Sequence, residues 1–375
     1  MRHTSTSPAG RKSIDDQVVV VVGASSGIGR VTVRRLAERG ASVVAAARSV
    51  DDLASLLEEC GSSPGTVVDV VADVTDEAAM AATASAAVQR FGRIDTWVGV
   101  AGVGLYGRAW DTSAAEYDTV MRTNWLGQVH GALAALPELR RSGGTLICIG
   151  SVESVRAVPL HAAYVSSKMA LRGFCDSLRM DLDADHAGVA VSLVLPAAID
   201  TPFFAHARSH LAGRPKPPPP VYTPDSVAAV ILRMAQHPRR EVVVGGSGLG
   251  FLAGQRLAPG LTDRLMTAGN SMLRGQQDPG PAEPADNLEA PVTGSGRDIG
   301  GHDGRRSLTS VLASARPAAR RAAGLGATAA GVAAGRVLAR RRVDEPTQPR
   351  DVVTVPETGT SGQTEPAGQT EVGAR

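Results

Sequence analysis

Short apolar runs and longer amphipathic stretches alternate along the chain between about residue 17 and residue 245. The runs are continuously apolar, which is typical of strands buried on both faces of a parallel sheet. We expect strands at residues 18–22, 42–47, 66–71, 96–100, 145–149, 190–194 and 241–244. Apolar positions three and four residues apart predict helices at residues 27–39, 51–59, 76–91, 114–140, 161–183 and 225–236. The alternation predicts an α/β fold, a doubly wound Rossmann-type parallel sheet of about seven strands with helices on both faces.

The same pattern divides the chain into segments. The strands and helices predict one domain at residues 16–246, after a disordered N-terminus at 1–15. Inside the domain, residues 197–223 break the alternation, and an excursion of that length is more typical of a functional lid than of a plain connection. The apolar but glycine-interrupted residues 247–275 are expected to pack on the domain surface. Residues 276–375 have low complexity and are expected to be largely disordered.

A basic segment lies inside this tail. Residues 304–342 contain nine arginines and no acidic residue, around an Ala- and Gly-rich middle. The segment is either a solvated tail or a weak helix that makes a slight contact with an anionic membrane surface or another polyanion. Arg336 and the glycine content argue against a membrane-spanning helix.

Charge and cysteine content narrow the function classes. The net charge of +2 gives no reason to expect nucleic acid as a partner. The three cysteines form no C-x-x-C pair, so we expect reduced thiols in the cytoplasm and neither disulfides nor a zinc site. The N-terminus has no apolar run, so we expect no signal peptide. The chain also has no uncharged apolar segment of 18 residues, so we expect no membrane span.

A glycine-rich loop follows the first predicted strand and opens the first predicted helix. Its sequence, VVGASSGIGR at residues 21–30, has the spacing G-x-x-x-G-x-G. Glycines allow a tight turn and a close backbone approach, and the helix N-terminus offers free N–H groups to a pyrophosphate. The alternative is a turn that merely packs helix on strand. The predicted phosphate contacts are Gly23, Ser25, Ser26, Gly27, Ile28 and Gly29.

The end of the second strand bears on the choice of dinucleotide. An acid there suits the free ribose hydroxyl of NAD(H), whereas an arginine suits the 2′-phosphate of NADP(H). This chain has Arg48 and no acid before Asp51. The sequence therefore favours NADP(H) and leaves NAD(H) as the alternative, and Arg48 could equally be a solvated surface residue.

Tyr164 and Lys168 lie one helical turn apart in HAAYVSSKMALRGF, residues 161–174. The chain has four tyrosines and three lysines, so a chance Tyr-x-x-x-Lys has a probability of about 3%. A free phenol, with a pKa of about 10, is a poor base at neutral pH. A neighbouring ammonium stabilises the phenolate, so we expect Lys168 to lower the pKa of Tyr164 toward the working range.

These two motifs together resemble the short-chain dehydrogenase/reductase family, in its compact single-domain branch, over about residues 17–245. Further matches are Asp73 in ADVTD, Asn124 in NWLG, Ser151 thirteen residues before Tyr164, and Thr201 in IDTPF. The chain departs from the family twice. The family's NNAG is Gly99-Val100-Ala101-Gly102 here, and its Pro-Gly after the sixth strand is Pro196-Ala197. The first change puts local hydrogen bonding in doubt, and neither change removes a proton-transfer group.

The resemblance implies an NADP(H)-dependent oxidoreductase that interconverts a carbonyl and an alcohol. Tyr164 would be the general acid and base, Ser151 would polarise the carbonyl, and Asn124 would support a proton relay to Lys168, which would also bind the nicotinamide ribose. Further cofactor contacts would be Asp73, Val74, Ala101, Gly102, Pro196, Ile199 and Thr201. The resemblance also implies a homo-oligomer, a dimer or tetramer, packed through the helices that carry Asn124 and Tyr164.

Other features concern the substrate and the rival class of function. Phe203, Phe204 and Tyr222 in the predicted lid favour an apolar small-molecule substrate, while His161 is expected on the surface. The rival class is a catalytically inactive nucleotide-binding module, or a membrane-surface scaffold that uses the basic tail. The altered motif at 99–102 supports the rival, and the intact Ser, Tyr and Lys set argues against it.

Overall fold

The structure is a computed structural model that describes residues 12–268, 277–279, 286–292, 294 and 296–302. The basic segment 304–342 lies outside the described residues, as does most of the N-terminal segment 1–15. No helix in the described part of the chain is long and apolar enough to cross a membrane. No cluster of three or more metal-binding side chains occurs among these same residues.

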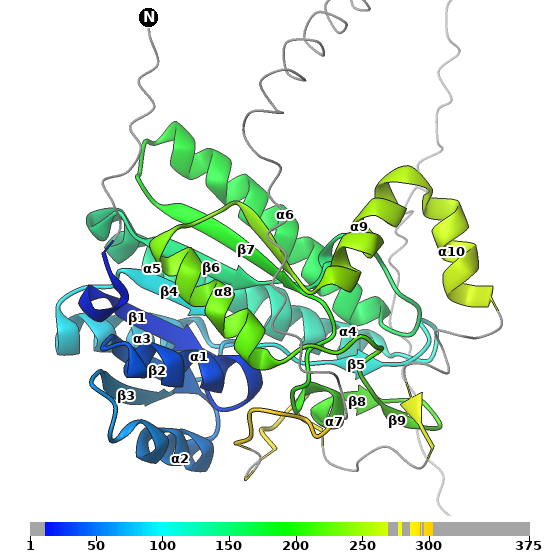
Figure 1. The fold of residues 1–375 in the computed structure, drawn as a ribbon, viewed down its shortest axis with the longest axis horizontal. Coiled ribbons are helices and arrows are strands. Elements are labelled where there is room, and N and C mark those ends of the chain that lie inside the picture. Colours follow the sequence, from blue (N-terminus) through cyan, green and yellow to red (C-terminus); the bar gives the residue numbers. More distant parts are fainter. Residues whose placement is uncertain (1–11, 269–276, 280–285, 293, 295, 303–375) are drawn as a thin grey trace, which may run out of the picture. The chain divides into compact units, whose positions relative to one another are not determined.

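A seven-stranded parallel sheet forms the centre of the fold (Figure 1). Its strand order is β10-β7-β6-β4-β1-β2-β3, which confirms the predicted doubly wound architecture. The chain builds outward from β1 through β2 and β3 and then continues on the other side of β1 with β4. The strands are β1 (Val18–Val22), β2 (Ser42–Ala47), β3 (Thr66–Val71), β4 (Thr96–Gly99), β6 (Thr145–Ile149), β7 (Ala190–Pro196) and β10 (Glu241–Val244). The change of direction between β1 and β4 opens a crevice at the carboxyl ends of the strands, where ligands of such folds bind.

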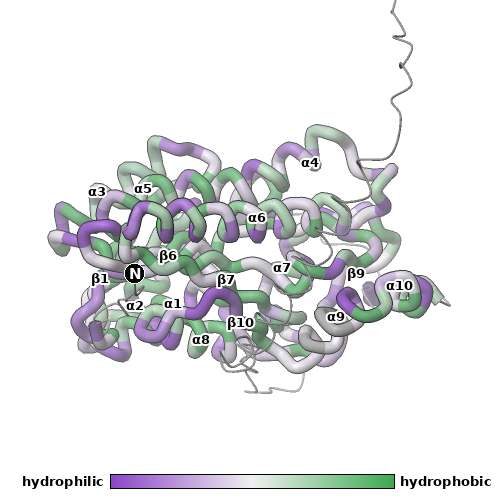
Figure 2. Tube along the Cα trace, turned by 90° about the horizontal axis from the view of Figure 1, so that it is seen from above, coloured by the Kyte–Doolittle hydropathy of each residue, from purple (hydrophilic) through white to green (hydrophobic). Residues whose placement is uncertain are grey.

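Helices cover both faces of this sheet. Figure 2 shows α1, α2 and α8 on one side of the strands and α3, α5 and α6 on the other. Their bounds are α1 (Gly27–Glu38), α2 (Val50–Cys60), α3 (Glu77–Phe91), α5 (Gly127–Ser142), α6 (Ala162–Ala184) and α8 (Pro224–Gln236). Strand β1 contributes Val19 and Val21 to the core under α1 and α8, and Val20 and Val22 to the core under α3 and α5. Burial on both faces explains why the strands are continuously apolar.

The helix predicted over residues 114–140 is interrupted. It consists of α4 (Ala114–Met121), a π-helical turn η2 (Arg122–Leu126) and α5. Residue spacing alone did not reveal this, because a single wider turn changes the apolar pattern very little. The π-helical turn carries Asn124, and such turns occur frequently at functional sites.

Smaller elements surround the carboxyl ends of the strands. The predicted lid contains the one-turn helix α7 and two short strands, of which β8 pairs with β5 and β9 with β11. Helix α9 packs on β10 and is followed by α10, so both occupy the range predicted for a surface extension. The bounds are β5 (Leu105–Tyr106), η3 (Val152–Ser154), α7 (Phe203–His206), β8 (Arg208–Ser209), β9 (Arg214–Pro215), α9 (Gly246–Leu257), α10 (Pro259–Thr267) and β11 (Gln277–Asp278). A further short helix, η1 (Ile14–Asp16), precedes β1 at the amino end of that strand.

The described residues between 286 and 302 differ from the disorder expected for residues 276–375. Leu288 is 1% exposed and packs against Val103 and Leu105. The Asn287 N–H donates to the carbonyl oxygen of His206 at 2.9 Å. Composition predicted disorder here because it shows neither that Leu288 fits into an apolar cluster nor that the backbone finds hydrogen-bond partners.

Candidate active site

The glycine-rich loop lies where β1 ends and α1 begins, in the crevice beside β4. Gly23 has φ +91°, and a Cβ on it would lie 2.5 Å from the Ala101 backbone nitrogen. A Cβ on Gly29 would lie 1.9 Å from the Gly23 carbonyl oxygen. Only glycine therefore fits at either position, and the first turn of α1 lies directly against the loop. The N–H groups of this turn, which have no partner within the helix itself, fit the pyrophosphate of a dinucleotide.

A cavity of about 120 Å³ adjoins this loop at the ends of β1, β2 and β3. Arg48 lies in its wall, with a guanidinium nitrogen 3.9 Å from a carboxylate oxygen of Asp73. The same guanidinium donates hydrogen bonds to the carbonyl oxygens of Asn287 at 2.9 Å and Glu289 at 3.3 Å. The predicted cofactor residues that line this cavity are Gly23, Ser25, Ser26, Arg48, Asp73, Val74, Ala101 and Gly102.

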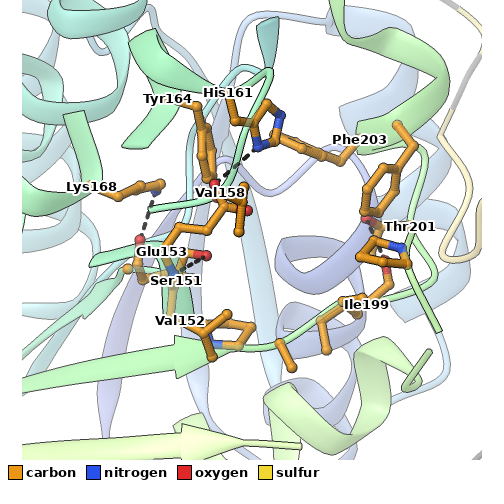
Figure 3. A pocket seen from close by; sticks show the side chains of 18 of the residues that line it. Ser151, Val152, Glu153, Val158, His161, Tyr164, Lys168, Ile199, Thr201 and Phe203 are labelled. Atoms are coloured by element: carbon orange, nitrogen blue, oxygen red, sulfur yellow. Dashed lines mark hydrogen bonds and ion pairs between the residues drawn. The ribbon is translucent and has the colours of Figure 1, made fainter. Parts of the chain in front are cut away.

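A larger cavity of about 310 Å³ lies beyond Gly102, which lines both cavities (Figure 3). Ser151 reaches it from the turn after β6, and Tyr164 and Lys168 reach it from α6. Pro196, at the end of β7, and Ile28, in the first turn of α1, also line it. The predicted residues that line it are Ile28, Gly102, Ser151, Tyr164, Lys168, Pro196, Ile199 and Thr201. The two cavities thus bring together nearly all the residues that the sequence analysis singled out from separate strands and helices.

Lys168 is buried beneath Tyr164. Its Nζ donates to the carbonyl oxygen of Ile149 at 2.9 Å and lies 5.6 Å from the centroid of the Tyr164 ring. Burial lowers the pKa of Lys168 from its ordinary 10.5 to about 8. The ammonium therefore gains or loses its proton close to neutral pH.

Tyr164 has a raised pKa. Burial is the largest cause, the carboxylate of Glu153 raises it further, and a hydrogen bond with Ser151 lowers it. The Ser151 oxygen also accepts a hydrogen bond from the backbone nitrogen of Glu153 at 3.1 Å. The helical spacing of the two residues predicted that Lys168 would lower the pKa of Tyr164. The structure instead gives a phenol that stays protonated at neutral pH.

Asn124 uses its amide to fix the backbone beside this site. Its Oδ1 accepts from the Val103 nitrogen at 2.7 Å, while Nδ2 donates to the Val103 carbonyl oxygen at 2.9 Å and to Ser167 Oγ at 3.1 Å. A Cβ on Gly102 would lie 3.3 Å from Asn124 Oδ1 and 3.6 Å from Lys168 Nζ. Asn124 and Lys168 therefore flank Gly102, where the two cavities meet.

Comparison with known proteins assigns the family. The sequence model of the short chain dehydrogenases matches residues 17–212. The chain belongs to the short-chain dehydrogenase family. It is 40% identical over 258 residues to the uncharacterized oxidoreductase YxnA of Bacillus subtilis (strain 168), an alignment that covers 68% of this chain and 72% of that protein. It is 31% identical over 270 residues to dehydrogenase/reductase SDR family member 7B of Bos taurus, with 69% and 82% covered. The chain is accordingly an oxidoreductase of this family.

Solved structures agree with this assignment. An alcohol dehydrogenase from the archaeon Thermococcus sibiricus, complexed with 5-hydroxy-NADP, has a TM-score of 0.54 at 27% identity. That match covers 61% of this chain and 95% of the other. A short chain dehydrogenase from Mycobacterium paratuberculosis bound to NAD has a TM-score of 0.57 at 21% identity, with 64% and 100% covered, and supports the fold alone.

The departure from the family's NNAG motif has a structural counterpart in Gln128. A Cβ on Gly99 would lie 2.0 Å from Gln128 Oε1, so the glutamine fills the space that a side chain at position 99 would need. Gln128 Nε2 donates to the Ala101 carbonyl oxygen at 3.1 Å. The doubt about local hydrogen bonding is thereby answered. The sequence indicated this replacement only through Gln128, a polar residue on the side of α5 that faces the sheet.

His161, Glu153 and Tyr106 are site residues that the sequence analysis missed. His161 was expected on the surface, yet it is 4% exposed, and its Nδ1 lies 3.0 Å from Glu153 Oε2. Its ring centroid lies 3.9 Å from that of Tyr106 and 4.9 Å from that of Tyr164. Burial raises the pKa of Tyr106. All three side chains line the larger cavity, and because they come from the short turn η3, the loop before α6 and the two-residue strand β5, no periodic pattern marked them.

The predicted lid covers part of the larger cavity. Phe203 and Phe204 line it, and Pro218 and Pro219 contribute from the proline-rich end of the lid. Tyr222 was expected among them, but it is buried in the core and its hydroxyl accepts a hydrogen bond from the Ser247 nitrogen at 3.2 Å. The apolar lining therefore owes less to the lid aromatics than the sequence suggested.

Proposed function

We propose that this protein interconverts a carbonyl and an alcohol with NADP(H) as the hydride carrier. The observation that supports this most strongly is the meeting of two cavities at Gly102, one beside the phosphate loop and one containing Ser151, Tyr164 and Lys168. A dinucleotide that spans the first cavity would present its nicotinamide in the second. The Thermococcus sibiricus relative was solved with an NADP derivative, which supports the same class of cofactor.

The side chains of the chain supply the proton chemistry. A bound nicotinamide would supply or accept the hydride. Ser151 would donate a hydrogen bond to the carbonyl oxygen and polarise it. Tyr164, held protonated by its raised pKa, would give its proton to the developing alkoxide. Lys168, with a pKa of about 8, would replace that proton and, when charged, stabilise the phenolate in the reverse direction.

The preference for NADP(H) over NAD(H) depends on Arg48. Its guanidinium lies in the wall of the smaller cavity at the end of β2, where the ribose 2′ position of a dinucleotide is bound in this fold. Its ion pair with Asp73 is long, at 3.9 Å, so a phosphate dianion in hydrogen-bonding contact would be the stronger partner. Arg48→Ala should weaken NADPH binding by about tenfold or more and NADH binding far less, as isothermal titration with both nucleotides would measure. Equal losses for the two nucleotides would refute this assignment.

The walls of the larger cavity favour an apolar substrate, one bearing a ring or a branched chain. Its lining is mostly aliphatic, aromatic and proline side chains, including Val152, Val158, Phe203 and Pro219. Its volume of about 310 Å³ falls in the range of small-molecule sites. Incubation of the purified protein with NADPH and a panel of cyclic and branched ketones should show loss of the nicotinamide absorbance. The proposal would be contradicted if no ketone lowered the nicotinamide absorbance and if none of the corresponding alcohols raised it with NADP⁺.

A homo-oligomer packed through α5 and α6 is part of the proposal. Leu133 on α5 is 51% exposed, and Met180 on α6 is 64% exposed, so each helix presents an apolar side chain to solvent. Light scattering coupled to size exclusion should give a dimer or tetramer. A mass of one chain would rule it out.

A further inference from the structure

Residues 286–292, 294 and 296–302, which we call the C-terminal strap, lie across the proposed cofactor-binding residues of the same chain. The described strap residues are drawn in gold beside α7 in Figure 1. At the phosphate loop, the Gly27 N–H donates to the carbonyl oxygen of Arg297 at 2.9 Å. Gly27 is the first residue of α1, and its N–H is among those that a helix leaves free for an anion. The strap thus occupies one of the donors that a pyrophosphate would use.

The strap also covers the residues that flank this donor. A Cβ on Gly300 would lie 2.4 Å from the Thr201 carbonyl oxygen, so the two backbones are in direct contact. Asp200 Oδ1 accepts the N–H groups of Gly300 at 3.0 Å and His302 at 3.2 Å. This part of the strap therefore lies on Thr201, a residue predicted to contact the cofactor.

The other end of the strap occupies the adenosine end of the site. Asn287, Pro291 and Val292 line the smaller cavity together with Arg48. The Arg48 guanidinium, proposed to bind the 2′-phosphate, donates to two strap carbonyl oxygens. A carbonyl dipole is a weaker partner for a guanidinium than a phosphate dianion, so a bound NADPH would displace these two bonds.

Contacts away from the cofactor residues hold the strap in place. Asp286 pairs with Arg208 at 2.9 Å, and Asp298 pairs with Arg34 at 2.5 Å. Leu288 is fully buried in a small apolar cluster. Specific side-chain contacts therefore hold the strap on the domain, and these contacts fix its position over the glycine-rich loop.

We propose that the strap is a built-in competitor of the dinucleotide, so that cofactor binding requires the strap to release Gly27 and Arg48. This inference depends on the proposed cofactor site and concerns how that site is regulated. When only a fraction of the molecules has the strap released, the measured dissociation constant equals the intrinsic one divided by that fraction. Weakening the strap at its remote anchors must then tighten dinucleotide binding without any change in the residues that touch the cofactor.

The test uses the full chain and two independent release variants. Asp286→Ala with Asp298→Ala removes the ion pairs with Arg208 and Arg34 and leaves the Glu289–Arg208 pair in place, and Leu288→Asp removes the buried anchor. Asp118→Ala is the matched control, because it removes an acidic partner of an arginine (Arg122) at an exposed position of α4. Fluorescence titration with NADPH should give a dissociation constant about tenfold lower for the release variants and unchanged for the control. Unchanged or weaker binding in both release variants would overturn the proposal.

Hydrogen exchange supplies a readout that needs no turnover. Addition of NADPH to the unmodified chain should speed exchange at the strap amides of Gly300 and His302, because their acceptor contacts are lost on release. Slower exchange there would mean that the strap closes over the cofactor, and would overturn the proposal. If neither the unmodified chain nor any variant binds NADPH or NADH, the proposed function itself fails. If all bind with one affinity, the function stands and the strap proposal fails.

Discussion

Replacing Lys168 by methionine should make the folded protein more stable at neutral pH while removing its activity. Lys168 is 3% exposed, and burial lowers its pKa from 10.5 to about 8. Between about pH 8 and pH 10.5 the folded chain binds fewer protons than the unfolded chain. Stability therefore falls as the pH is lowered through that window and stays at the lower level beneath it. At ~1.4 kcal/mol per pH unit, burial of the charged form costs about 3 kcal/mol at pH 7.

Methionine fills a similar volume without a charge but loses the hydrogen bond from Nζ to the Ile149 carbonyl oxygen, a loss of about 1 kcal/mol. The net gain at pH 7 is therefore about 2 kcal/mol, or a rise of ~4–8 °C in Tm for a domain of this size. At pH 10.5 half or more of the unfolded lysine is neutral too, so the gain should nearly vanish.

Urea denaturation of both proteins at pH 7 and pH 10.5 would measure these two differences in the free energy of unfolding. Lys12→Met is the control, because the Lys12 side chain is 42% exposed and pairs with Asp95. That variant should show no gain at pH 7. The claim that burial of the charged Lys168 destabilises the fold would be refuted in either of two cases. Lys168→Met would be less stable than the unmodified chain at pH 7, or its gain in unfolding free energy would be the same at both pH values.

Two further substitutions test the loop and the cavity. Gly29→Ala should destabilise the fold by about 1–3 kcal/mol and weaken NADPH binding, because its Cβ would lie 1.9 Å from the Gly23 carbonyl oxygen. The control is Gly173→Ala, at a helical position where a Cβ would have no neighbour within 4 Å. This variant should stabilise the fold by ~0.5–1 kcal/mol in thermal denaturation. Glu153→Gln should lower the pKa of Tyr164 by removing a nearby negative charge, so the oxidation rate should begin to rise at a lower pH in a profile of kcat/KM. An unchanged profile would count against that coupling.

The parts of this molecule that could be predicted from sequence are those with a strong local pattern. Strand β1 consists of five consecutive valines, all buried, and such a sequence suits only a strand that is covered on both faces. The glycine loop and the Tyr164–Lys168 pair could be found because their spacing directly matches a backbone turn and a helical turn. The predicted fold is confirmed, and most of the predicted site residues line two adjoining cavities, while Gly27, Gly29 and Asn124 line neither.

The remaining features depend on tertiary contacts that spacing does not show. The raised pKa of Tyr164 comes first from burial and then from the Glu153 carboxylate, and a sequence shows neither the burial nor the distance between the two side chains. His161 precedes α6 in a loop, so nothing marked it as buried. Among the described residues of the strap, Leu288 is the one buried apolar side chain, and the other contacts come from the backbone and from the carboxylates of Asp286, Glu289 and Asp298. Such a polar composition is typical of disordered segments.

The most direct test of the central claim, that Tyr164 donates the proton in a nicotinamide-dependent reduction, is a comparison of Tyr164→Phe with the unmodified chain. Both the NADPH dissociation constant and kcat for one accepted ketone would be measured. The phenol oxygen is lost while the ring and its neighbours remain, so NADPH binding should stay within about twofold and kcat should fall by about a hundredfold to ten-thousandfold. A variant that keeps full kcat would contradict the claim.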